Sequence, residues 1–207
     1  GGLQQLQAER KINTLRPAGV KGRKKKGRKL AMSRFVDPLV VGRVVGEVVD
    51  LFVPSVAMAV TYGAKDVSNG YHVKPSMATD EPLVRISGRR NDLYTLVMTD
   101  PDAPSPSEPT MREYLHWIVM NIPGGTDATK GDVVVPYMGP QPPVGIHRYV
   151  LVLFQQKSRL VDGYAAPPAD RPYFNTRAFA YHHELGLPVA VVYFNSQKEP
   201  SANRRRR

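Results

Sequence analysis

One stretch of the sequence decides both the fold and the site: Asp100–Pro106 reads DPDAPSP, and the strand-like run YLHWIV follows at Tyr114–Val119. Prolines disfavour helical geometry for the residue before each of them, so the first stretch is expected to form a stiff turn. The turn follows the apolar run Leu93–Met98, whose composition is typical of a buried strand. In an extended chain, Asp100 and Asp102 would direct their carboxylates to the same side. Because this rigid turn carries two acids at the end of a buried strand, we predict that it forms the floor of a binding site.

The length and composition indicate one folded domain. A chain of 207 residues has room for a single core with modest tails. The absence of cysteine excludes disulfides, thiol nucleophiles and cysteine-ligated metals. No apolar run approaches the roughly 20 residues that a membrane-spanning helix needs. We therefore expect an intracellular soluble protein without integral membrane insertion. We also expect it to be a monomer.

The net charge of +11 is concentrated in the tails. Residues 1–31 carry a net charge of +9 and residues 204–207 are four arginines, whereas residues 32–203 carry −2. We predict a disordered basic extension over 1–31, a folded domain over 32–200 and a basic tail over 201–207. The extension is either a polyanion-binding or nuclear-import segment, or a stretch that folding does not need. The nearly neutral body does not support a basic nucleic-acid-binding face.

Runs of β-branched and aromatic residues, punctuated by proline or glycine, predict a chain of short strands. These runs are Val48–Val53, Ala57–Tyr62, Tyr71–Lys74, Leu83–Ser87, Leu93–Met98, Tyr114–Ile122, Val133–Val135, His147–Gln155 and Val189–Phe194. The pair Asn69–Gly70 predicts a hairpin turn. Two helices are expected, one over Leu39–Val44 after the cap Asp37, and one over Thr176–Leu185 after the cap Asn175. Many strands with few helices predict a mainly β, antiparallel architecture.

Three segments that are distant in the sequence would supply polar side chains for one pocket if their loops converge. The carboxylates of the turn are joined by an imidazole from the run that follows it, and by an imidazole and a phenol on one face of a later strand. These side chains are Asp100, Asp102, His116, His147 and Tyr149. Imidazole and phenol donate hydrogen bonds to an anion, and a carboxylate orients an imidazole by accepting from its other nitrogen. We expect an anion pocket in which the aspartates orient the histidines or form the rim.

Three other interpretations remain open. An acid–base hydrolase would use an aspartate as base and a histidine as acid, although no nucleophile motif or cofactor loop accompanies them. A metal held by His116, His147 and an aspartate is conceivable, but no ligand spacing in the sequence supports it, and we predict neither metal nor cofactor. Binding of nucleic acid through the basic tails would show a steep salt dependence.

Five motifs follow one another along the chain. They are DPDAPSP at Asp100–Pro106, REYLHW at Arg112–Trp117, GIHRY at Gly145–Tyr149, FNTR at Phe174–Arg177 and LGLPVA at Leu185–Ala190. Together they resemble the signature motifs of the phosphatidylethanolamine-binding protein family, over about residues 37–200. Within that family the chain resembles the plant branch of flowering regulators, and most of all the group called MOTHER OF FT AND TFL1.

The resemblance implies a large antiparallel sheet flanked by a smaller sheet and by a few short helices. It places an anion pocket at one end, with Pro142 and Pro143 in its wall. It also implies a non-enzymatic role, because plant members bridge phosphopeptide-binding 14-3-3 adaptors to bZIP transcription factors. The implied ligand is an anionic small molecule or a phospholipid head group. The implied processes are seed germination, dormancy, abscisic-acid signalling and flowering, with the protein in cytoplasm and nucleus.

The residues at positions that distinguish subgroups of the family do not all match one subgroup. Tyr114 matches the residue of floral promoters, whereas Pro172 replaces both the glutamine of promoters and the aspartate of repressors. Thr95, Pro123 and Arg159 match positions that contact the adaptor in floral promoters. Two further contact positions differ, so the resemblance leaves 14-3-3 binding open.

Overall fold

The computed structural model describes residues 36–161 and 170–200 of the chain. Within them, one sheet contains β3 (Tyr71–His72), β5 (Leu93–Asp100), β6 (Tyr114–Pro123), β7 (Asp132–Val135), β8 (Ile146–Gln156) and β9 (Ala190–Gln197). A smaller sheet contains β1 (Ala57–Tyr62), β2 (Lys65–Asp66) and β4 (Leu83–Ser87). The helices are α1 (Pro38–Val41), α2 (Val44–Glu47) and α3 (Thr176–His182), with single 3-10 turns η1 (Pro75–Met77) and η2 (Ala128–Lys130).

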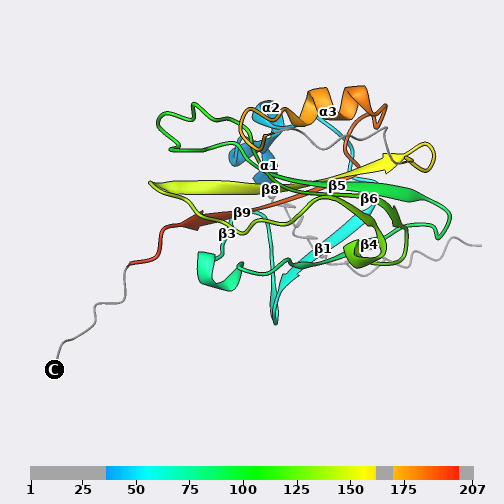
Figure 1. Cartoon of the computed structure of the whole chain (residues 1–207), viewed down its shortest axis with the longest axis horizontal. Coiled ribbons are helices and arrows are strands. Elements are labelled where there is room, and N and C mark those ends of the chain that lie inside the picture. The colour runs from blue at the N-terminus through cyan, green and yellow to red at the C-terminus, as the bar shows by residue number, and fades with distance from the viewer. Residues whose placement is uncertain (1–35, 162–169, 201–207) are drawn as a thin grey trace, which may run out of the picture. The chain divides into compact units, whose positions relative to one another are not determined.

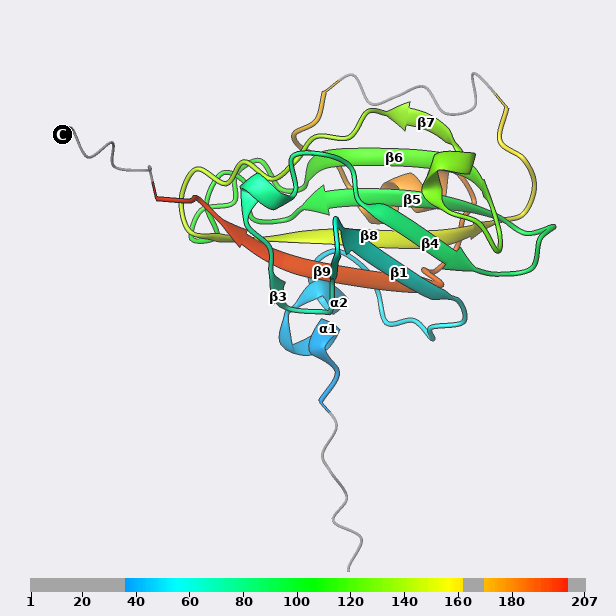
Figure 2. The same cartoon turned by 90° about the horizontal axis from the view of Figure 1, so that it is seen from below.

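The large sheet lies between the helices and the small sheet. Its strand order is β3-β9-β8-β5-β6-β7, and that of the small sheet is β2-β1-β4. The helices lie on one side of the large sheet in Figure 1, and Figure 2 shows β1 and β4 in front of its other side. The predicted fold class, a large antiparallel sheet flanked by a smaller one and by a few short helices, is confirmed.

The burial of the central strand β5 explains why this architecture can be predicted from the sequence. Every residue of β5 after its first is buried, and β8 pairs with it in an antiparallel register from Leu93 opposite Gln156 to Thr99 opposite Val150. Alternate side chains of β5 belong to two hydrophobic cores. Met98 packs in the core between the two sheets, and Val97 packs in the core between the large sheet and the helices. A strand covered on both faces has no polar face, so it reads as a nearly continuous apolar run.

The predicted strand Val48–Val53 is wrong. Val48 and Val49 follow α2 in a turn, and the backbone N–H groups of both point to the carbonyl oxygen of Val44. Both side chains are buried in the core beneath the helices, whereas Leu51 and Val53 are 76% and 84% exposed. The β-branched residues here are used for packing from an irregular segment, which composition alone does not distinguish from a strand.

The Asn69–Gly70 pair does not form a hairpin. The N–H of Gly70 donates to the carbonyl of Tyr193, and the side-chain oxygen of Asn69 accepts from the N–H of Tyr193 at 3.0 Å. The turn thus docks on β9, and β3 then runs parallel to β9 with Tyr71 opposite Phe194. Tertiary contact with β9 overrides the local hairpin signal.

Both predicted helix caps are confirmed, but the helices are shorter than predicted. The carboxylate of Asp37 accepts from the N–H of Leu39, and the amide oxygen of Asn175 accepts from the N–H of Ala178. The first helix is divided where Arg43 adopts left-handed geometry, with a φ of 56°. The last one ends at His182 because the chain turns back at Glu184, which has a φ of 51°.

The basic segments 1–31 and 201–207 lie outside the described residues, so their predicted disorder and the domain bounds stay predictions. In the described part of the chain, no helix combines the length and the apolar character that crossing a bilayer requires.

Candidate functional site

A hollow of about 220 Å³ lies where β5, β6 and β8 meet the proline-rich turn. It is lined by Asp100, Ala103, Pro104, Met111, Tyr114, His116, Met138, Gln141, Pro143, His147 and Tyr149. The structure therefore brings together five of the seven residues predicted to bind a ligand, and the exceptions are Asp102 and Pro142. Pro142 is buried beside the hollow without lining it.

His147 is held as a buried cation. Its Nδ1 lies 2.7 Å from Oδ2 of Asp100, and its Nε2 lies 3.0 Å from the carbonyl oxygen of Val144. Both neighbours are acceptors, so the arrangement favours a proton on each ring nitrogen. Burial lowers the pKa of His147, but the hydrogen bond and the charge of Asp100 outweigh burial, and the pKa lies above its ordinary value. This contact is the one that the predicted orienting role of Asp100 requires.

His116 reaches the hollow through a β-bulge. On β5, Met98 pairs with Trp117 and Thr99 pairs with Leu115, so His116 has no partner there. Bulges of this kind redirect a side chain and are frequent beside functional sites. The Nδ1 of His116 donates to the carbonyl of Met138 at 2.6 Å, which leaves Nε2 for a ligand. Burial lowers the pKa of His116, so the unliganded ring is a neutral imidazole.

Tyr149 fixes the two histidines relative to each other. Its ring centroid lies 5.1 Å from that of His116, edge to face, and 6.5 Å from that of His147 in a stacked arrangement. Its other stacking partner is Phe194 at 5.4 Å. Burial raises the pKa of Tyr149 far above its ordinary value, so the phenol keeps its proton and can donate it to a ligand.

Asp102 serves the opposite face of β8, which corrects the prediction that the two carboxylates share one side. Its two oxygens accept from the Nε and Nη2 of Arg148 at 2.9 and 2.7 Å, and its Oδ2 also accepts from the backbone N–H of that residue. The reason is local: Oδ1 of Asp100 accepts from the N–H of Asp102 at 2.7 Å, which closes a turn in place of an extended chain.

Sequence reasoning missed Met111, Met138 and Gln141 in the lining. It also missed Arg171, whose guanidinium donates to the carbonyls of Leu115 and His116. No motif marks these residues. Their place depends on how the loops fold over the sheet, so only the nearness of Gln141 to the prolines of its loop could have suggested it.

The two subtype positions lie near His116. Tyr114 lines the hollow, and its ring centroid lies 5.5 Å from that of His116. Pro172 is half-buried, one residue after Arg171, whose carbonyl accepts from the N–H of Leu115 at 2.8 Å. The segment with Pro172 therefore runs beside the start of β6.

The predicted adaptor-contact residues lie at the other end of the sheet, and the structure corrects one of them. Thr95 is 0% exposed, and its hydroxyl donates to the amide oxygen of Gln156, so its side chain does not reach a surface where an adaptor could bind. Pro123 is half-buried at the end of β6. Arg159 is exposed and forms an ion pair with Asp132 at 2.8 Å.

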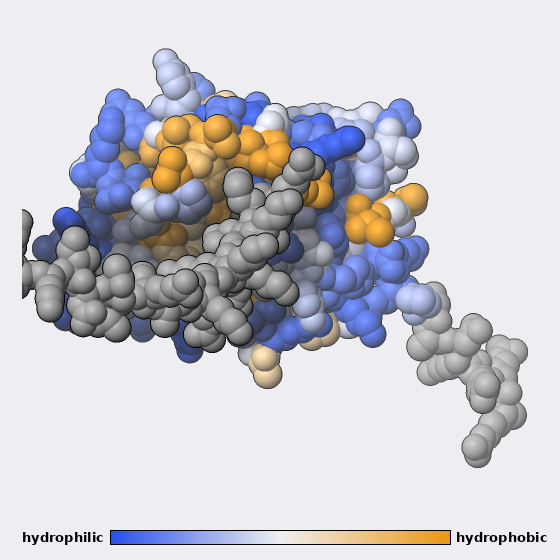
Figure 3. All heavy atoms as spheres, turned by 180° about the vertical axis from the view of Figure 1, so that it is seen from behind, coloured by the Kyte–Doolittle hydropathy of each residue, from blue (hydrophilic) through white to orange (hydrophobic). Residues whose placement is uncertain are grey.

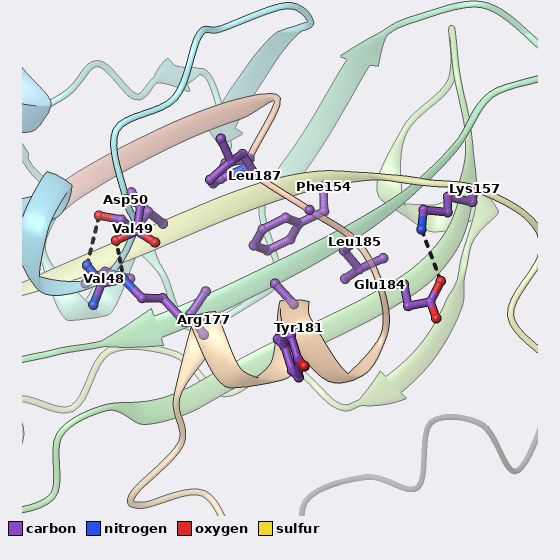
Figure 4. A pocket seen from close by; sticks show the side chains of 14 residues that line it. Val48, Val49, Asp50, Phe154, Lys157, Arg177, Tyr181, Glu184, Leu185 and Leu187 are labelled. Atoms are coloured by element: carbon purple, nitrogen blue, oxygen red, sulfur yellow. Dashed lines mark hydrogen bonds and ion pairs between the residues drawn. The ribbon is translucent and has the colours of Figure 1, made fainter.

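Another hollow, of about 660 Å³, is a separate groove on the helix side. Figure 3 shows apolar surface gathered on that face. In Figure 4, Phe154 and Leu185 lie between two ion pairs, Asp50 with Arg177 and Lys157 with Glu184. None of the predicted site residues lines this groove.

Metal ligands are not gathered in the described part of the chain: no three histidine, aspartate or glutamate side chains there are placed to hold one ion. The histidine pocket has instead the parts of an anion site. It holds one buried imidazolium, one phenol and one imidazole nitrogen without a protein partner, inside walls of proline and methionine.

Comparison with known proteins places this geometry in a family. The sequence model of the family described as phosphatidylethanolamine-binding protein matches residues 52–194 of this chain. Protein MOTHER of FT and TFL1 homolog 2 from Oryza sativa subsp. japonica is 75% identical over 175 residues, which are 84% of this chain and 100% of that protein. Protein TERMINAL FLOWER 1 from Arabidopsis thaliana is 52% identical over 174 residues, 84% of this chain and 97% of that protein.

A solved structure agrees with these relatives. The carboxypeptidase Y inhibitor, in complex with its cognate proteinase, superposes with a TM-score of 0.70 at 25% identity, over 78% of this chain and 94% of the inhibitor. The plant relatives are named as regulatory proteins and not as enzymes, so the predicted resemblance and the predicted non-enzymatic character are both confirmed. The chain belongs to the phosphatidylethanolamine-binding protein family.

Proposed function

We propose that this protein is a regulatory scaffold whose histidine pocket receives an anionic group, such as the phosphate of a small molecule or of a phospholipid head group. The observation that carries the proposal is the Asp100–His147 pair, set beside His116 and Tyr149 in one hollow. A neutral pocket of this size would need none of these buried polar groups, because each is costly to bury without a partner.

The chemistry of the pocket suits a phosphate that carries a proton. The charge of His147 is nearly cancelled by Asp100, and its two N–H groups are already used. Tyr149 offers a hydroxyl donor, and the neutral His116 offers an acceptor at Nε2. A monoprotonated phosphate can donate to Nε2 and accept from the phenol, and the apolar walls strengthen both contacts.

The biological setting follows from the relatives. We infer that the protein acts with bZIP transcription factors in seed germination and dormancy, including abscisic-acid signalling, or in flowering control, in both cytoplasm and nucleus. The 75% identity to a MOTHER of FT and TFL1 homolog supports this setting. Contact with a 14-3-3 adaptor would involve the exposed Arg159.

The pocket is tested by calorimetric titration of the full chain with inorganic phosphate. His116→Ala should weaken binding by about tenfold, as expected for the loss of one hydrogen bond to a charged group. His182→Ala is the matched control, because His182 is exposed on α3 and lies outside the pocket. Equal affinity of the wild type and His116→Ala, with both proteins folded by circular dichroism, would remove the pocket from the proposal.

The scaffold role is tested by pull-down from plant nuclear extract with antibodies against bZIP factors and 14-3-3 adaptors. Recovery with the wild type, and loss of the adaptor with Arg159→Ala, is the expected result. Recovery of neither class with the wild-type protein would contradict the scaffold role and leave the phosphate measurement unaffected.

A further inference from the structure

A second polar hollow, of about 330 Å³, lies on the face of β8 opposite to the histidine pocket. Its charged lining consists of Arg43, Glu47, Asp102, Arg112 and Arg148. Three cations therefore face two anions, which leaves an excess of one positive charge. None of these residues lines the histidine pocket, so this hollow lies outside the proposed function.

Arg148 satisfies both acids of the hollow. Its guanidinium donates to both oxygens of Asp102, and its Nη2 also donates to Oε2 of Glu47 at 2.6 Å. Its Nη1 donates to the carbonyl of Gly42 at 2.7 Å. Arg148 is therefore a structural cation with four of its five side-chain N–H groups committed, and the two carboxylates are already hydrogen-bonded before any ligand arrives.

The other two guanidinium groups keep donors for a ligand. Arg43 is exposed in the turn between α1 and α2, and it makes no ion pair and no side-chain hydrogen bond with the described residues. Arg112 donates through Nε to the carbonyl of Pro101 at 2.7 Å, and its Nη2 lies 3.5 Å from Oε2 of Glu47. Its Nη1 has no partner in the described part of the chain.

We propose that this hollow binds a phosphate monoester between Arg43 and Arg112. The two side chains come from different segments of the chain. A phosphate monoester has three terminal oxygens and can accept a pair of N–H groups from each guanidinium, whereas a carboxylate has only two oxygens. The hollow is within the size range of small-ligand pockets, about 300–1,000 Å³. Because both cations are partly solvated, we expect a dissociation constant on the order of a millimolar.

The experiment is a two-dimensional NMR titration of the full chain with O-phospho-L-serine, in the His116→Ala background that weakens the first pocket. The amide signals of Gly42, Arg43, Glu47 and Arg112 should shift and saturate together. L-serine at the same concentrations and ionic strength should shift none of them. Signals from the basic segments 1–31 and 201–207 are followed separately, since loose binding there does not saturate in step with the hollow.

Arg43→Gln is the decisive variant because the Arg43 side chain makes no hydrogen bond and no ion pair with the described residues. It should weaken phosphoserine binding by about tenfold. Arg85→Gln is the matched control, since Arg85 is an exposed arginine on β4 far along the chain from the hollow, and the loss of charge is the same. Arg112→Lys keeps the charge but loses the fork, and should weaken binding less than Arg43→Gln.

Equal weakening by Arg43→Gln and Arg85→Gln would overturn the proposal, because the effect would then be that of net charge alone. So would saturating shifts confined to the basic segments. Sedimentation with vesicles that contain phosphatidic acid distinguishes a lipid phosphate from a soluble one, and dependence on Arg43 in either assay supports the site. The result is separable from the histidine pocket, because that pocket is weakened in this background and none of the residues followed here lines it.

Discussion

The two ends of the β5–β6–β8 layer carry buried polar side chains for opposite purposes. At one end, Asp100 orients His147, while Nε2 of His116 is left without a protein partner beside a hollow. At the other end, Gln156 and Asn121 exchange a pair of side-chain and backbone hydrogen bonds in a closed ring. Gln156 also lines hollows of about 520 and 290 Å³, so the contrast lies in the hydrogen bonds. A ring nitrogen left without a protein partner indicates binding, and a complete network indicates support.

The complete network holds the loop that carries Arg159. The side chain of Asn121 accepts from the N–H of Leu160 and donates to its carbonyl, and it also donates to Asp132, the ion-pair partner of Arg159. Thr95 joins through Gln156. The buried Thr95 thus contributes to the surface around Arg159 indirectly, by fixing the side chains beneath it.

The largest effect is expected where the network is broken. Asn121→Ala removes hydrogen bonds to Gln156, Leu160 and Asp132, and places alanine at a φ of 57°. It should lower the free energy of unfolding by about 4 kcal/mol, measured by urea denaturation. Asn91→Ala, at an exposed position, is the control. A loss below 1 kcal/mol would mean that the ring does not support the fold.

A buried acid near the pocket end should give the next largest effect. Glu113 is 5% exposed and accepts from Thr99 and from the side chain and N–H of Thr176. Burial raises the pKa of Glu113 to about 7, in spite of these hydrogen bonds. Because the folded pKa lies above the unfolded value, the stabilising contribution is complete below pH 4.5 and is lost as the pH rises through 7.

The difference between wild type and Glu113→Gln isolates this contribution. The free energy of unfolding of the wild type should fall by about 3 kcal/mol more than that of Glu113→Gln between pH 4.5 and 8. Urea denaturation at each pH measures it. Parallel pH profiles of the two proteins would show that Glu113 does not titrate in this window.

The Asp100–His147 pair should give a smaller effect that appears in binding. Asp100→Asn removes the charge that raises the pKa of His147, which is also the charge that nearly cancels that of the imidazolium. At pH 5.5, where protonation of His147 in the variant leaves a positive charge that no carboxylate offsets, phosphate should bind about tenfold more tightly to the variant than to the wild type. Calorimetry at pH 7 and pH 5.5 measures both affinities, and the same pH dependence in the two proteins would contradict the role of the pair.

The smallest effect is expected at the surface of the supporting end. Arg159→Ala breaks an exposed ion pair with Asp132 and should change the free energy of unfolding by less than about 1 kcal/mol. Any loss of adaptor binding in this variant would then report on contact and not on folding. A larger loss of stability would show that Arg159 belongs to the network beneath it.

Sequence patterns located much of this arrangement. Strands β5, β6 and β8 were readable because long buried strands concentrate apolar residues, and the two caps were readable because their hydrogen bonds are local. Two-residue spacing placed His147 and Tyr149 on one face of a strand, and the family resemblance implied that His116 lies in the same pocket, which it lines together with them.

The remainder depends on contacts between distant segments. The bulge that redirects His116 is a register shift between two strands, and the partner of Asp102 is the guanidinium of Arg148 on the distant strand β8. The burial of Thr95 follows from the position of β5 in the middle of the sheet. None of these facts has a local signal, since each is decided by tertiary pairing.

The pairing of His147 with Asp100 has a kinetic consequence. A cation and an anion 2.7 Å apart form a dipole whose field fades within a few ångströms in solvent, well inside a Debye length of about 8 Å. The pocket therefore cannot draw a phosphate from a distance, and the rate of capture is set by unguided diffusion and by the width of the entrance. Added salt should leave that rate nearly constant.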